Sequence, residues 1–228
     1  MAGALTRPWR TTPRGGPGPA EALAVLLALV VLEAGAVAAF PGLGGAAALW
    51  ATGALRTGEA ALCLLYWKLR GWQWGDLGLT GPCVRPGLAV GIAFCGAFAA
   101  TSLLAEAGGR LFADKSFLAV LAGPRPGEEE LLALLVVGAG IAPLFEELAF
   151  RGILYGGLRR RLGPVPAGAA ATAAFAAAHL FTTGVPWIQA VGGLAFFAAY
   201  EISGSLWAPI LVHACGNLAL FLLPLAFG

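Results

Sequence analysis

The stretch LLALLVVGAGIAPLFEELAFRG, residues 131–152, decides the fold. It is long enough to cross a bilayer as a helix, which takes about 20 apolar residues. Two adjacent carboxylates, Glu146 and Glu147, lie near its end, and Arg151 follows them. Charged groups are costly inside a membrane, so those found there usually serve a function. The run therefore predicts a membrane helix that carries chemistry.

The composition of the whole chain agrees with a membrane protein. Of its 228 residues, 59% are hydrophobic and 11% are charged, and the mean hydropathy is +0.81. Soluble domains carry about a quarter charged residues. Further apolar stretches lie at about 20–40, 44–66, 86–107, 164–181, 186–203 and 206–227. We predict an all-α, polytopic membrane helical bundle with about seven transmembrane helices, in a range of about six to eight.

The N-terminal residues differ from the rest. Residues 1–19 are rich in proline and glycine and include three arginines, which predicts a disordered tail. Residues 20–228 form the predicted transmembrane helical domain, with 131–227 as its catalytic core. Lys and Arg in excess mark the cytoplasmic side of short loops, so the tail predicts a cytoplasmic N-terminus. The high content of Ala, Gly, Pro and Arg and the compact loops are typical of a bacterial chain, so the expected location is the inner (cytoplasmic) membrane of a bacterium.

The segment at 44–66 is the least apolar of these stretches, because it contains Arg56 and Glu59. These two side chains are three residues apart and can pair across one helical turn. If the segment did not span the membrane, the orientation of every later helix would invert.

The four cysteines and the net charge argue against a metal-finger site and a nucleic-acid partner. Cys63, Cys83, Cys95 and Cys215 lack the spacing of a metal finger, so we interpret them as small buried residues. The formal net charge is only +2, and we expect no nucleic-acid partner. The composition predicts the lipid bilayer as a partner.

The two carboxylates at 146 and 147 predict different roles. Glu147 and Arg151 are four residues apart with the acid first, the favourable order for an ion pair on a helix. Glu146 points about 100° away and has no local partner. We therefore predict that Glu147 and Arg151 support the site and that Glu146 acts as a general base.

The two histidines lie in separate apolar segments. His179 follows Phe175 by one helical turn, and His213 precedes Asn217 by one turn. Each residue alone is explained by a bond between helices, which contributes about 0.6 kcal/mol. Together they offer proton transfer and hydrogen-bond donors for an oxyanion, provided that they reach one depth. The depths agree if the helix of Glu146 continues to about residue 160, and agree poorly if it ends at Phe150.

Three pieces in this order, EELAFR (146–151), FAAAH (175–179) and HACGN (213–217), resemble the motifs of the CPBP family of intramembrane proteases. This group includes type II CAAX prenyl endopeptidases and bacterial relatives tied to bacteriocin processing and immunity. The resemblance covers about residues 140–220 and extends to the flanking text GSLWAPILVHACGN. It is specific for the family and much less specific for a substrate.

The resemblance implies a glutamic-type mechanism without a cofactor. Glu146 with His179 would activate a water for attack on a peptide carbonyl, and His213 with Asn217 would stabilise the oxyanion. The implied partner is a membrane-associated peptide or protein substrate, and the implied task in a bacterium is removal of a C-terminal sorting segment or a leader peptide.

Three alternatives stay open from the sequence. Two histidines and a glutamate can bind zinc, although no HExxH pair is present, so a zinc-dependent protease is the first. A non-catalytic immunity or scaffold protein that uses the same pocket is the second. A proton-coupled carrier is the third and weakest, because the chain has no two matching halves.

Overall fold

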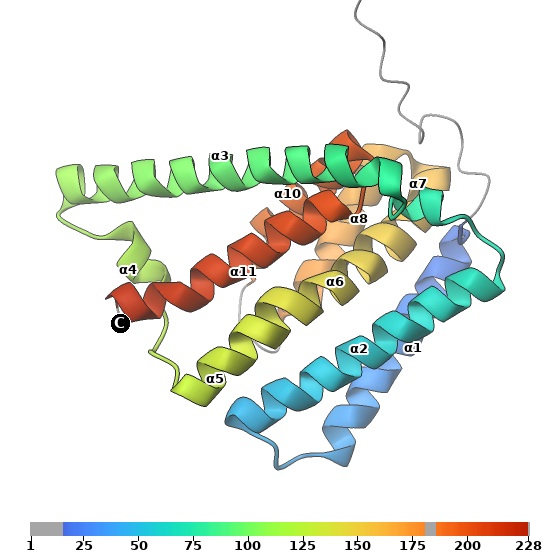
Figure 1. Ribbon diagram of the computed structural model, residues 1–228, viewed down its shortest axis with the longest axis horizontal. Coiled ribbons are helices and arrows are strands. Elements are labelled where there is room, and N and C mark those ends of the chain that lie inside the picture. Colours follow the sequence, from blue (N-terminus) through green and yellow to red (C-terminus); the bar gives the residue numbers. More distant parts are fainter. Residues whose placement is uncertain (1–15, 181–185, 228) are drawn as a thin grey trace, which may run out of the picture.

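The computed structural model describes residues 16–180 and 186–227, and the elements within this part are helical, as predicted (Figure 1). Each predicted apolar segment forms a helix. The long helices outside the centre are α1 (Pro19–Ala39), α2 (Gly45–Leu69), α3 (Gly81–Ala113), α8 (Pro164–Ala177), α10 (Trp187–Ser203) and α11 (Trp207–Phe227). A short 3-10 helix, η1 (Trp74–Leu77), and a short helix, α4 (Phe117–Leu121), flank α3.

The central helix is continuous but not uniform. Its parts are α5 (Glu128–Ala133), the π-helical η2 (Leu134–Ile141), α6 (Ala142–Glu147), the π-helical η3 (Leu148–Tyr155) and α7 (Gly156–Leu162). Such π segments are uncommon and occur frequently at functional sites. The helix continues past residue 160, so the condition for Glu146, His179 and His213 to share a depth is met.

Among the residues that the structure describes, four stretches are long and apolar enough to cross a membrane: Pro19–Ala39, Trp74–Ala113, Glu128–Leu162 and Trp207–Phe227. Helix α2 is long but less apolar, and α8 and α10 are shorter. Large apolar side chains point outward from α1 and α3, including Val31, which is 62% exposed, and Leu104, which is 72% exposed. A polytopic membrane bundle is therefore confirmed, while the number of about seven crossings stays a prediction.

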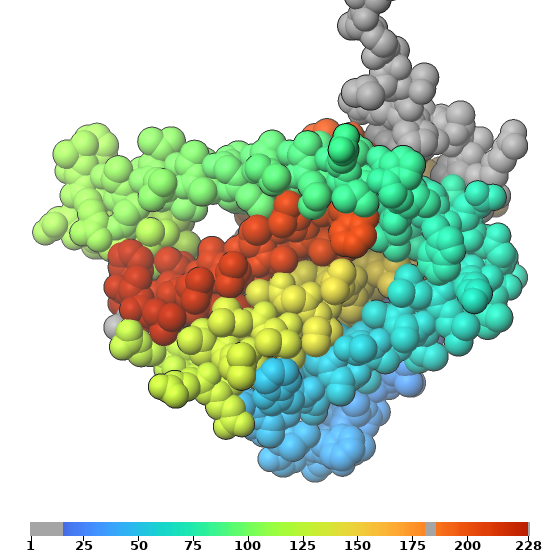
Figure 2. Space-filling view, viewed as in Figure 1, coloured from blue at the N-terminus to red at the C-terminus, as the bar shows by residue number. Residues whose placement is uncertain are grey.

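Helix α11 lies at the centre of the face shown in Figure 2, between α3 on one side and the central helix on the other. Two glycines of α3 permit its close approach. A Cβ atom at Gly91 would lie 3.2 Å from the carbonyl oxygen of Ala208, and one at Gly87 would lie 2.5 Å from Ser205 Oγ. Small residues at helix contacts are typical of membrane bundles. This packing brings α3 close to α11, the helix of His213.

Basic side chains gather at the end of the bundle where α1 begins. Arg70 pairs with Glu21 at 3.0 Å, and Arg160 donates to the carbonyl oxygen of Gly16 at 2.5 Å. Arg159 pairs with Glu201 at 2.8 Å at the same end. Of the predicted disordered tail, residues 1–15, with all three arginines, lie outside the described residues.

Candidate active site

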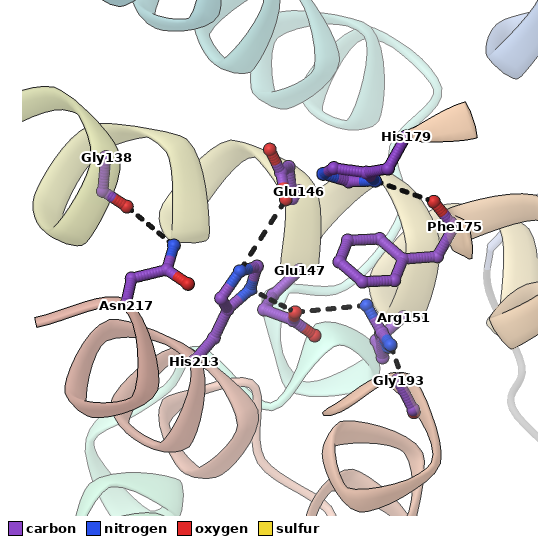
Figure 3. Close-up of polar contacts among 9 residues, drawn as sticks. All are labelled: Gly138, Glu146, Glu147, Arg151, Phe175, His179, Gly193, His213 and Asn217. Atoms are coloured by element: carbon purple, nitrogen blue, oxygen red, sulfur yellow. Dashed lines mark hydrogen bonds and ion pairs between the residues drawn. The ribbon is translucent and has the colours of Figure 1, made fainter. Parts of the chain in front are cut away.

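The adjacent carboxylates leave α6 in two directions (Figure 3). Glu147 is fully enclosed, and its Oε1 accepts from Arg151 Nη1 at 3.0 Å and faces His213 Nδ1 at 2.9 Å. The ion pair expected from the sequence is therefore present, and His213 is a second partner of the same oxygen. Because a carboxylate only accepts, the contact orients the imidazole with Nδ1–H toward Glu147.

Arg151 is held from three sides. Its Nη2 donates to the carbonyl oxygen of Gly193 on α10 at 3.1 Å. The guanidinium carbon lies 4.8 Å from the ring centre of Phe175 and 5.1 Å from that of Phe196. Its side chain is 1% exposed, so this charge is almost wholly removed from solvent and lipid. The arrangement fixes Glu147, and through it His213.

His213 links the two carboxylates. Its Nε2 lies 3.7 Å from Glu146 Oε2, on the side of the ring opposite Glu147. The imidazole stacks on Phe196, with ring centres 4.4 Å apart and planes 17° apart, and meets the edge of Phe175. The ring can move little, and Nε2 stays directed at Glu146.

His179 lies just beyond the end of α8, and Figure 3 shows its ring pointing toward Glu146. Its Nδ1 is 2.9 Å from the carbonyl oxygen of Phe175. A carbonyl only accepts, so Nδ1 carries a proton and Nε2 is the nitrogen able to take one up. Glu146 and His179 line one cavity of about 200 Å³. The other residues that line it are Leu26, Leu29, Val30, Glu33, Arg56, Phe145, Ala149, Phe150 and Ala178.

Asn217 bonds to the backbone of the central helix rather than to another candidate residue. Its Nδ2 donates to the carbonyl oxygen of Gly138 at 2.8 Å. In the π segment, Ala142 N–H reaches back to Val137. By the same pattern, the backbone N–H of residue 143 would donate to the carbonyl oxygen of Gly138. Residue 143 is a proline, which has no N–H. Asn217 supplies the missing donor, and its second N–H remains for other use.

The site thus unites Glu146, Glu147, Arg151 and His213 by direct contacts, with His179 across the shared cavity. Two partners had no sequence signal: the carbonyl group of Gly193 and the stacking ring of Phe196. For a third, the carbonyl group of Gly138, Pro143 was an available sequence signal. Within residues 16–180 and 186–227, no three His, Cys, Asp or Glu side chains are grouped to hold a metal ion.

Comparison with known proteins gives one match. The family described as "Type II CAAX prenyl endopeptidase Rce1-like" matches residues 128–219, which include every candidate residue named above. This match confirms the family resemblance drawn from the three motifs. No curated protein and no solved structure matches the chain.

Proposed function

We propose that this chain, which through residues 128–219 belongs to the Rce1-like family of type II CAAX prenyl endopeptidases, is a glutamic-type intramembrane endopeptidase. The observation that carries the proposal is the position of Glu146. Its side chain lies between His213 and the cavity that it shares with His179. A general base needs such access to a water and a second group for the proton.

The proposed reaction uses these positions as follows. A water in the cavity gives a proton to Glu146, with His179 as the neighbouring proton carrier, and its oxygen bonds to the peptide carbonyl carbon. The carbonyl electron pair moves to its oxygen, which becomes an oxyanion. The C–N bond then breaks as the held proton passes to the leaving nitrogen, and a carboxylic acid and an amine result.

Two donors are suited to the oxyanion. His213 donates Nδ1–H to Glu147, so its Nε2 donates to the oxyanion when the ring is doubly protonated, with that second N–H directed to the space beside Glu146. Asn217, one turn further along α11, has an N–H beyond the one given to Gly138. Donors fixed before the reaction are effective because no reorganisation is required as the charge develops. Glu147 and Arg151 support this role by holding the imidazole in place.

The substrate we propose is a bacterial C-terminal sorting segment or leader peptide. The α1 wall of the cavity consists mainly of apolar side chains, among them Leu26, Leu29 and Val30, which suits a hydrophobic segment. The basic end of the bundle supports a cytoplasmic N-terminus in the inner membrane, because Lys and Arg mark that side.

The test uses the full chain in liposomes with a quenched fluorogenic peptide that ends in a hydrophobic helix. Glu146→Gln keeps the shape and removes the base, and should lower kcat about 10²–10⁴-fold with unchanged thermal stability. Glu129→Gln, an exposed acid in α5, is the matched control and should cleave normally. Full cleavage by Glu146→Gln would refute the mechanism. Tight binding of the peptide without cleavage by the unaltered chain would favour a scaffold protein.

A further inference from the structure

A second charged group lies in the wall of the cavity that contains Glu146 and His179. Arg56 on α2 contacts Glu33 on α1 and pairs with Glu59 Oε2 at 3.1 Å. We call Glu33, Arg56 and Glu59 the cavity triad. The pair within α2 was expected from the spacing, but Glu33 comes from another helix. Three charges gathered where α2 meets α1, a helix apolar enough to cross a membrane, call for a functional explanation.

The cavity triad is not a closed structural network. The side chain of Glu59 is 1% exposed, whereas those of Arg56 and Glu33 are 19% and 35% exposed and line the cavity. Both carboxylates contact the same nitrogen, Nη1 of Arg56. A guanidinium has five N–H donors, so most of them serve neither acid. Buried Nε of Arg56 and Oε1 of Glu59 also have no hydrogen-bond partner among the described residues.

The position of the triad relates it to the reacting bond. The guanidinium carbon of Arg56 lies 4.7 Å from the ring centre of Phe145, the residue before Glu146. A peptide that reaches Glu146 in this cavity of about 200 Å³ therefore also lies beside Arg56 and Glu33. The other α1 residues that line this cavity, Leu26, Leu29 and Val30, are apolar.

A peptide bond must leave the helix before water can attack it, and its neighbours then have unpaired N–H and C=O groups. In apolar surroundings each unpaired group costs several kcal/mol. We propose that Arg56 and Glu33 bind the substrate backbone beside the scissile bond, Arg56 donating to a carbonyl oxygen and Glu33 accepting from an N–H. Glu59 holds Arg56 in place. This inference rests on the proposed function and adds two substrate-binding residues to it.

The test combines backbone changes in the probe with changes in the protein. Replacing one peptide bond by an ester removes its N–H and weakens its carbonyl acceptor. Esters are placed in turn at each bond within two residues of the cleavage site of the fluorogenic peptide. At one position, the ester should raise KM about 10-fold with the unaltered chain, because one or two hydrogen bonds are lost.

Glu33→Leu should raise KM by a similar factor with kcat preserved, and the ester should then have little further effect. Glu33→Gln, which retains an acceptor, should restore most of the affinity. Arg56→Lys keeps the charge beside Glu59 and should behave like Glu33→Leu. Arg110→Gln removes an exposed arginine paired on α3 and is the matched control, with KM unchanged.

Several outcomes overturn the inference. If the increases in KM caused by the ester and by Glu33→Leu multiply independently, the replaced backbone group and Glu33 are not in contact. If KM depends on the charge of a substrate side chain and not on the backbone esters, the cavity triad recognises a side chain instead. A chain that cleaves no such peptide refutes the proposed function and this inference with it, whereas cleavage without coupling refutes the inference alone.

Discussion

Two clusters of charged side chains, Glu147 with Arg151 and the cavity triad, are buried to different degrees. Glu147 and Arg151 have side chains that are 0% and 1% exposed, and their partners on α10 and α11 hold them from several sides. In the cavity triad, Glu33 and Arg56 face an open space. An enclosed ion pair fixes geometry, while a partly exposed one keeps donors and acceptors for a ligand. The chain uses the first to orient His213 and, in our proposal, the second to hold a peptide.

The largest contrast should appear when one acid is removed from each group. Glu147→Gln leaves the buried charge of Arg151 without a counter-charge and should lower the free energy of unfolding by about 3–5 kcal/mol. Glu33→Gln leaves Arg56 paired with Glu59 and should lower it by at most about 1 kcal/mol. Unfolding in mixed detergent micelles measures both. Equal losses of unfolding free energy in the two variants would contradict the idea that burial makes the two clusters differ.

Asn217→Ala should lower kcat about 10²–10³-fold through loss of an oxyanion donor. It also leaves the Gly138 carbonyl unpaired, at a cost of about 1–3 kcal/mol in unfolding free energy. Adding Pro143→Ala returns a backbone N–H to that carbonyl. The double variant should regain stability and remain slow. If it regains kcat as well, Asn217 acts only on the helix.

A smaller effect is expected from Gly193→Ala, which tests how tightly α10 holds Arg151. The new Cβ atom would lie 2.8 Å from Thr172 Cγ2 and 3.4 Å from Arg151 Nη2. Such overpacking should cost about 1–3 kcal/mol in thermal unfolding experiments. Thr172→Ser removes the contacted methyl group and should recover most of the loss. If Thr172→Ser recovers none of the stability lost in Gly193→Ala, the new Cβ atom acts through its contact with Arg151.

The smallest expected effect is that of metal removal. The glutamic mechanism predicts that a chelator leaves kcat/KM unchanged. Metal analysis of the purified protein should find no stoichiometric ion. Stoichiometric zinc that is lost in His179→Ala or His213→Ala would replace the proposed mechanism with a zinc-dependent one.

Local patterns were predictable because helix geometry is repetitive. The apolar segments became helices, and the i,i+4 pair of Glu147 with Arg151 and the i,i+3 pair of Arg56 with Glu59 are both present. Contacts between helices were not predictable from these patterns. Glu147 with His213, Arg151 with Gly193 and Arg56 with Glu33 each join different helices, and their geometry depends on how those helices pack.

The sequence by itself determined that this protein is an all-α membrane bundle, and it predicted the candidate catalytic residues Glu146, His179, His213 and Asn217, with Glu147 and Arg151 in support. Hydropathy and helical periodicity are properties of neighbouring residues, so they can be obtained without a structure. Only the tertiary structure decided that Glu146 faces a cavity while Glu147 is enclosed, and that Arg56 and Glu33 line the same cavity. Those facts depend on the rotation and depth of each helix against its neighbours, which packing fixes and local sequence does not.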